Sequence, residues 1–493
     1  MKYYLITAIV ALTAWTLLAV VLIPEPAGEG RIPLTWVTGQ NPQRSVQTEW
    51  FNRLNPCCEL RTDPANTGAM KVVVQCSAGM GPDLIGGVTA KNYDTYLDAG
   101  ILMDLTEIAP EAGFGPDTIP EELHPLILRR DPETLEYRQY VYPANYAHTI
   151  ILYNKDLFDA HGVSYPSEDL TWEEYIDIAR KLTVYRDGQA DVPVQFGAGG
   201  AKQMICIWGK GGRVMNEGGT RCRLGEPEAI AGMQFFHDLY FRYQAEPTPT
   251  QKASVTTQGG FGSGSFFSWF GEQKIAMIFG ARWMLIQLRR YYQDQLEARR
   301  EWEGAHPGET YPGLTPPRLG ACLVPRFADG KRYTTVGYRC VGVNRQGPHR
   351  QEAVKFLEYL AGPKYSELIN RGADSKPPNK KYISLERFRH PDWPGEEPVH
   401  RMAVESIPYG RVPQPSMFIA PGNVNRALKN LTEKLQSSSN MTGADIAHVM
   451  KAAAKRLNKQ IAENIRRRPE LRSAYERLVE RGYEPVASEA DLL

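Results

Sequence analysis

Hydrophobic positions along the chain alternate between short apolar runs and stretches with helical spacing. Ile32 to Val37 is typical of a buried strand, and Asp83 to Gly87 predicts a second strand that opens into a Gly-rich turn. Between them, the apolar residues from Val46 to Leu54 recur on one face of a predicted helix. Strand, helix and strand in this order favour an α/β fold with a mainly parallel sheet covered by helices.

The middle and the end of the chain are richer in helical patterns. Thr171 to Glu174 predicts a capping box, in which a hydroxyl and a carboxylate three residues apart satisfy free amides at a helix start. Helical spacing returns from Pro227, from Ala353 to Leu360 and from Ile446 to Ile461. The polar, Gly/Ser-rich stretch 248–265 predicts a loop.

One segment is long and apolar enough to interact with a membrane. Tyr3 to Ile23 carries no charge, and at about 1.5 Å per residue a helix of this length can cross a hydrocarbon layer of ~30 Å. Residues 1–30 are therefore expected to be a signal peptide or an uncleaved signal anchor. The anchor is favoured because the apolar run exceeds the roughly 7–15 residues of a signal-peptide core and no small-x-small cleavage site follows. Either alternative places the remaining chain in the periplasm or at the outer face of the cytoplasmic membrane.

The charge balance removes one class of function. Lys plus Arg total 57 against 56 Asp plus Glu, so the formal net charge is +1 and nothing global favours nucleic acid. The seven cysteines are too few for a disulfide framework in 493 residues, although Cys206 and Cys222 are close enough to close a loop. No metal, cofactor or catalytic residue is expected, because the His-Glu-x-x-His, Cys-x-x-Cys, Gly-x-Ser-x-Gly and phosphate-loop motifs are missing.

Four segments carry a resemblance to a known family. They are Gly81 to Ile85 with Tyr96 to Thr106, Tyr142-Pro143 with Ile151 to Phe158 and Thr171 to Tyr175, Lys274 to Ile278 with Gly280 to Trp283, and Ala353 to Leu360 before Gly362-Pro363. In this order and spacing the chain resembles the family 1 extracellular solute-binding proteins, which include maltose-binding protein and related sugar receptors. It departs from them at Gln273, where a small Gly is common, and it has no lipid-attachment Cys.

The resemblance implies a two-lobed periplasmic-binding-protein fold of type II, with the ligand cleft between discontinuous lobes. The chain would cross between lobes near Tyr142-Pro143 and again near Thr335 to Val343. The expected division is residues 31–142 plus about 335–385 for lobe 1, 143–334 plus about 386–465 for lobe 2, and 466–493 as a charged C-terminal extension. Residues 294–318 form an insertion that such proteins usually lack.

A sugar presents C–H faces and many hydroxyls, so its receptor needs aromatic platforms and a few polar groups in a cleft. The resemblance places the candidate ligand contacts on cleft-facing segments: Gln40, Asn41, Thr89, Lys91, Asn145, Tyr146, Trp208, Arg282, Trp283, Tyr338, Arg339 and Phe418. Each has a structural alternative, such as core packing for Trp208, a surface ion pair for Arg282 or turn chemistry for Asn41. A lone histidine is more often structural, so His148 stays outside the predicted site.

The resemblance implies a non-catalytic, monomeric receptor that captures a sugar or oligosaccharide by hinge closure and delivers it to an ABC permease. Three alternatives remain open. One is a membrane-anchored sensory receptor of the same fold. Another is an exported polysaccharide hydrolase, because two carboxylates on separate loops leave no local signature. The third keeps the binding role but changes the ligand to a metal chelate, phosphate ester or polyamine.

Overall fold

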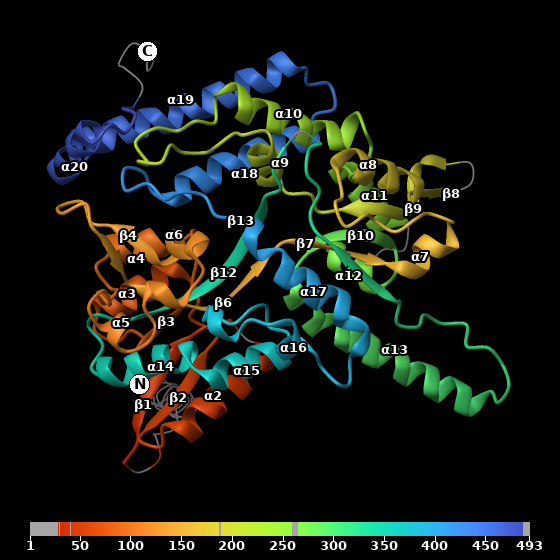
Figure 1. The fold of residues 1–493 in the computed structure, drawn as a ribbon, viewed down its shortest axis with the longest axis horizontal. Coiled ribbons are helices and arrows are strands. Elements are labelled where there is room, and N and C mark those ends of the chain that lie inside the picture. Colours follow the sequence, from red (N-terminus) through yellow and green to blue (C-terminus); the bar gives the residue numbers. More distant parts are fainter. Residues whose placement is uncertain are drawn as a thin grey trace, which may run out of the picture.

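The computed structural model describes residues 28–486 except 29, 40, 187–188, 259–264 and 329. The apolar N-terminal segment and Gln40 thus lie outside the described residues. The strands form two large sheets (Figure 1). The first sheet contains β1 (Ile32–Val37), β2 (Cys58–Asp63), β3 (Leu84–Val88), β6 (Val141–His148), β12 (Thr334–Val343) and β13 (Gly410–Arg411). The second contains β7 (Ile150–Asn154), β8 (Val184–Arg186), β9 (Gln189–Gly199), β10 (Ile275–Gly280) and β11 (Leu319–Cys322).

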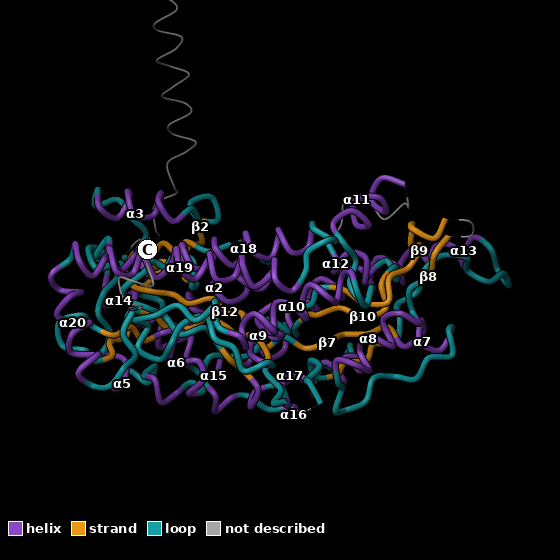
Figure 2. The backbone as a smooth tube through the Cα atoms, turned by 90° about the horizontal axis from the view of Figure 1, so that it is seen from above, coloured by secondary structure: helices purple, strands orange, loops and turns teal. Residues whose placement is uncertain are grey.

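Helices cover both sheets and define two lobes, which occupy opposite ends of the elongated molecule (Figure 2). The first lobe packs its core with α2 (Pro42–Leu54), α3 (Ala69–Ser77), α4 (Tyr93–Asp98), α14 (Arg350–Ala361) and α15 (Pro363–Arg371). The second lobe uses α7 (Lys155–Ala160), α8 (Trp172–Lys181), α9 (Gln203–Gly209), α10 (Pro227–Phe241), α12 (Phe266–Gly271) and α17 (Glu397–Glu405). A further apolar cluster lies under α18 (Pro421–Ser437), α19 (Gly443–Arg467) and α20 (Pro469–Glu480).

Both sheets are mixed, so the expectation of mainly parallel sheets is only partly right. In the first sheet β1 is parallel to β2 and β3, but β12 is antiparallel to both β3 and β6. In the second sheet β7 opposes both β10 and β11, while β9 and β10 run parallel. The parallel pair is the one whose strands are joined by a long helical crossover, from α9 to α12, as parallel pairing requires.

The predicted strands at 32–37 and 84–88 are present, and so is the helix that follows the first strand. The predicted buried face of that helix is only partly right, because Phe51 is buried as expected but Val46 is 39% and Leu54 is 53% exposed. Arg44 and Gln47 face inward instead. The reason is a distant partner, because Arg44 Nη1 donates to Asp374 Oδ2 at 2.9 Å inside the lobe.

The predicted capping box at Thr171 forms only in part. Thr171 Oγ1 accepts from the Glu174 N–H at 3.2 Å, as expected. The Glu174 carboxylate instead accepts from the Ser167 N–H at 2.7 Å and from its hydroxyl at 2.6 Å, which ties the preceding loop to the helix. The later pair Thr442 and Asp445, which the sequence reading missed, forms a complete capping box at the start of α19.

Two further expectations need correction, namely the loop at 248–265 and the loop closed by Cys206 and Cys222. The described part of the polar stretch 248–265 begins with a helix, α11 (Pro249–Gln258), and not with a loop. The insertion near residue 300 continues α13 (Leu285–Ala305), which projects from the body (Figure 1). All seven cysteines are free thiols, so Cys206 and Cys222 are not paired.

Within the described residues, no helix combines the length and the apolar character that a membrane span needs.

A small hairpin of β4 (Leu128–Arg130) and β5 (Tyr137–Gln139) reaches the C-terminal helix α20. Its turn residue Leu135 has a φ of 63° and is buried in the apolar cluster under α18, α19 and α20. Arg477 of α20 donates to the carbonyl of Glu133 at 2.6 Å and to that of Pro132 at 2.8 Å. The C-terminal extension is therefore folded onto this hairpin.

We expect Leu135→Ala to lower the free energy of unfolding by about 2–5 kcal/mol, because it empties a buried apolar site. The matched control is Leu314→Ala, since Leu314 is 47% exposed and its truncation leaves no buried cavity. Urea unfolding followed by circular dichroism measures both variants. Equal midpoints for the two would contradict the burial of Leu135.

Candidate ligand-binding pocket

A pocket of about 310 Å³ opens between the two lobes, near the lower end of the roughly 300–1,000 Å³ typical of small-molecule sites. We call it the inter-lobe pocket. From the first lobe it is lined by the short helix η2 (Glu121–Leu123) and by Pro125 of α6 (His124–Ile127). Across from them lie Trp208 of α9, Arg213 to Met215 with Glu217, and residues 410–414 starting in β13. Its walls therefore come from chain segments almost three hundred residues apart.

One wall of the inter-lobe pocket is a stack of aromatic rings and a guanidinium. The guanidinium carbon of Arg411 lies 5.6 Å from the centre of the Trp208 ring and 4.9 Å from that of Tyr333. Trp208 itself is buried, so packing holds the indole at this wall. Both distances are within the roughly 6 Å at which a cation is attracted to an aromatic ring, so the two rings hold the guanidinium at this wall.

The opposite wall contains a carboxylate with an unused acceptor. Glu122 Oε1 is buried and has no hydrogen-bond partner among the described residues. Burial raises the pKa of Glu122, and the positive charge of Lys376 opposes this shift only in part. An acceptor held in this state favours a ligand that brings its own hydroxyl donors.

Behind Gly410 lies a buried polar cluster around Lys376. The Lys376 ammonium donates to the carbonyl of Ala403 at 2.8 Å and lies 2.6 Å from Nδ1 of His148. Burial lowers the pKa of both Lys376 and His148. Gly410 is required for this packing, because a Cβ there would lie 2.2 Å from His148 Nε2. His148 is thus a core residue, in agreement with its exclusion from the predicted site.

The hinge strands bring four predicted site residues together. Tyr146 of β6 pairs with Tyr338 of β12, and Asn145 pairs with Arg339. The Asn145 amide donates to Asp374 Oδ1 at 2.9 Å, so this side chain serves the internal network that also holds Arg44. These residues lie in the junction between the lobes, but none of them lines the inter-lobe pocket.

Arg282, predicted as a ligand contact, is 1% exposed and has its N–H groups occupied within the protein. It lies in η3 (Arg282–Met284) of the second lobe. Its partners are Nδ1 of His400 at 3.2 Å and the carbonyls of Ile369 at 3.4 Å, Ser375 at 2.7 Å and Phe388 at 3.3 Å, together with that of Asn370. Burial lowers its pKa to about 9. Arg282 therefore ties η3 to α15 and the segments that follow, and the surface ion pair considered as its alternative is not formed.

The other predicted contacts lie away from the inter-lobe pocket. Asn41 caps α2 by accepting from the Gln43 N–H at 2.9 Å, which is ordinary turn chemistry. The Thr89 N–H donates to Asn92 Oδ1 at 2.8 Å within a turn, and the neighbouring Lys91 is exposed. Phe418 is buried against Tyr475 of α20, with ring centres 6.0 Å apart. Trp283 keeps 37% of its surface exposed beside the buried Arg282.

Trp208 is thus the predicted residue that lines the inter-lobe pocket. Sequence reasoning missed Glu121, Glu122, Arg213 and Arg411. Glu121 and Glu122 lie on one short turn, and Arg411 lies on a two-residue strand, so no periodic pattern marks them. The one local signal is that Arg411 lies seven positions before Phe418, which was predicted as a ligand contact.

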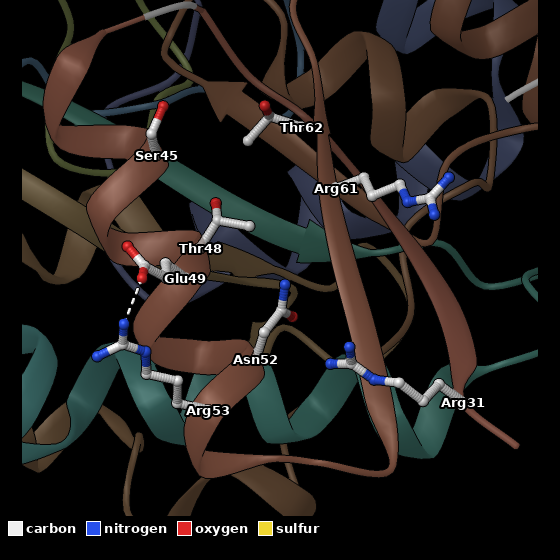
Figure 3. A pocket seen from close by; sticks show the side chains of 8 residues that line it. All are labelled: Arg31, Ser45, Thr48, Glu49, Asn52, Arg53, Arg61 and Thr62. Carbon is white, nitrogen blue, oxygen red and sulfur yellow. Dashed lines mark hydrogen bonds and ion pairs between the residues drawn. The ribbon is translucent and has the colours of Figure 1, made fainter. Parts of the chain in front are cut away.

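A second, more open depression of about 590 Å³ lies on the first lobe alone. Figure 3 shows its polar lining, which comes from α2 and from the chain at β1 and β2, with Glu49 paired to Arg53. None of its described lining residues is aromatic or belongs to the second lobe. Closure of one lobe onto the other would leave this depression unchanged, so the inter-lobe pocket is the better candidate site.

Comparisons with known proteins agree with the overall fold. The family model described as "Bacterial extracellular solute-binding protein" matches residues 39–367. No curated protein sequence gives a significant match. Among solved structures, an ABC substrate-binding protein from Listeria monocytogenes in complex with cycloalternan superposes with a TM-score of 0.66 at 18% identity, covering 88% of this chain and 99% of that one.

Two further solved structures share the fold. A solute-binding protein from Thermotoga lettingae bound with α-D-tagatose gives a TM-score of 0.64 at 18% identity, covering 87% of this chain and 100% of that one. The maltose/maltodextrin-binding domain from Bdellovibrio bacteriovorus bound to maltotriose gives a TM-score of 0.59 at 17% identity, covering 86% of this chain and 99% of that one. The predicted two-lobed α/β architecture is confirmed, and the chain belongs to the bacterial extracellular solute-binding protein family.

Proposed function

We propose that this protein captures a sugar or oligosaccharide outside the cytoplasm and delivers it to an ABC permease. The observation that carries the proposal is the inter-lobe pocket, which combines an indole, a guanidinium and a carboxylate whose Oε1 has no hydrogen-bond partner among the described residues. An aromatic face matches the C–H side of a sugar ring, and the charged groups match its hydroxyls.

The connection between the lobes supports binding by hinge closure. The chain passes from β6 in the first sheet to β7 in the second across Thr149, and it returns to the first sheet at β12. We propose residues 31–142 with about 335–385 as lobe 1 and residues 143–334 with about 386–465 as lobe 2, with β6, β12 and β13 of the first sheet forming the connection between them. Rotation about β6 and β12 would then move η2 relative to Trp208, opening and closing the pocket.

The solved proteins of the same fold support the ligand class. Three of them are bound to cycloalternan, α-D-tagatose and maltotriose, which are carbohydrates. Membership in an extracellular solute-binding family supports export, with residues 1–30 as a signal peptide or anchor. We further propose that the protein acts as a monomer, that its partner is a permease in the cytoplasmic membrane, and that the ligand is released without chemical change.

A thermal-shift screen of the purified full-length chain against mono- and oligosaccharides tests this function. A ligand that binds only the folded state raises the melting temperature by RT ln(1 + [L]/Kd), about 2.7 kcal/mol of stabilisation at one hundred times Kd. We expect at least one carbohydrate to raise the melting temperature, with no sugar product released on prolonged incubation. A screen without any carbohydrate shift, or release of a hydrolysis product, would contradict the proposal.

Glu122→Gln is expected to stabilise the free protein while weakening sugar binding. Because burial raises the pKa of Glu122, the wild type loses stability relative to the variant as pH rises above the ordinary carboxyl pKa of about 4.3. The variant should therefore melt higher at pH 7, and the difference should shrink at pH 4. Loss of the charged acceptor should weaken binding by roughly tenfold or more, because hydrogen bonds to charged groups contribute about 1.5–3 kcal/mol.

Melting curves at both pH values and calorimetric titration of a carbohydrate from the screen measure the two effects of Glu122→Gln. Glu136→Gln is the matched control, because Glu136 is exposed on the β4–β5 hairpin outside the pocket. The control should change neither quantity. Unchanged affinity in Glu122→Gln would remove this carboxylate from the site.

A further inference from the structure

Charges in the inter-lobe pocket are separated between its two sides. Glu121 and Glu122 belong to the first lobe, whereas Arg213 and Arg411 lie on the segments opposite them. The third lining carboxylate, that of Glu217, is already neutralised by Arg213 at 2.8 Å. The side of the pocket that contains Trp208 therefore has one guanidinium, that of Arg411, without a carboxylate partner among the described residues.

The surroundings of Arg411 make this guanidinium receptive to an anion. It stacks on Trp208 and Tyr333, and within the described part of the chain no hydrogen bond or ion pair engages its N–H groups. Burial lowers the pKa of Arg411, the Tyr333 hydroxyl opposes this shift, and the positive charge of Arg213 adds to it. An anion bound to Arg411 would offset the desolvation, because it supplies the opposite charge that this guanidinium lacks among the described residues.

A guanidinium is planar and presents two parallel N–H groups at its edge, which match the two oxygens of a carboxylate or phosphate. Neutral hydroxyls can also bind there, but they would leave the desolvated positive charge of Arg411 without a counter-charge. A cationic ligand such as a polyamine would be repelled by that charge. The geometry around Trp208 and Tyr333 therefore selects for an anionic group at this side of the pocket.

We propose that the ligand is an acidic sugar, whose carboxylate or phosphate binds edge-on to Arg411 while its ring hydroxyls donate to Glu122. This inference rests on the proposed function, because it takes the inter-lobe pocket as the sugar site. It goes further by naming the class of sugar and the residue that selects it. Arg411 is then the specificity-determining residue, and Arg213 is a bystander already paired with Glu217.

Calorimetric titration of the full-length chain with matched sugars tests this inference. The probes are hexuronates, hexose 6-phosphates and the neutral parent hexoses of the same ring configurations, each also as the disaccharide where it exists. We expect a uronate or a sugar phosphate to bind at least tenfold tighter than its neutral parent. The uronate and phosphate arms decide which anionic group is recognised.

Arg411→Met should abolish this preference. It should weaken binding of the acidic sugar by roughly tenfold to hundredfold and change the affinity for the neutral parent little. Arg411→Lys keeps the positive charge but loses the planar guanidinium, so it should lose part of the preference for the acidic sugar. This variant provides the test if Arg411→Met does not fold. Arg213→Gln is the matched control in the same pocket, and it should retain the preference.

The outcomes separate the two proposals. Equal or tighter binding of the neutral parent sugars would overturn the acidic-sugar inference and leave the sugar-binding function standing. Full anion preference in the Arg411 variants would also overturn the inference. Failure of every sugar to bind would overturn both.

Discussion

The antiparallel pairing of β6 with β12 is the constraint on which the rest of the structure depends. It runs from Val336 opposite His148 to Gly342 opposite Val141, with an irregularity between Arg339 and Cys340. β6 leads directly into the second sheet, and β12 also pairs with β3 of the first and with the short strand β13. Because β13 supplies Gly410 and Arg411, this pairing also sets where the pocket wall lies relative to η2.

Buried polar groups fix the junction around these strands. Asp374 accepts from Arg44 at 2.9 Å and from Asn145 at 2.9 Å, and Arg282 binds carbonyls on segments that follow α14. Burying such groups costs free energy unless every partner is present, so they define one geometry more than they add stability.

Local patterns in the sequence predicted the fold well. The strands at 32–37 and 84–88 and the helices beginning near residues 42, 172, 227, 350 and 443 follow from periodicity and capping signals, and the order of motifs indicated the family. The burial of Arg44 on the inward face of α2 could not be predicted, because it depends on Asp374, 330 positions away. The direction in which neighbouring strands of the second sheet pair could not be predicted either, because it depends on tertiary packing.

The site was harder to predict than the fold. Motif resemblance located Trp208, but it also selected Arg282, whose buried carbonyl partners come from segments with no recognisable pattern. Glu122 and Arg411 lie on elements of two or three residues, too short for periodicity to reveal. Their roles depend on what tertiary packing leaves unpaired.

The central claim is that ligand binds between the lobes, and hydrogen–deuterium exchange with and without the tightest-binding sugar tests it most directly. The account predicts slower exchange in three peptides together, covering 121–125, 208–217 and 410–414, because both lobes close on one ligand. Protection confined to residues 45–62, around the depression of Figure 3, would place the ligand on a single lobe and contradict the account.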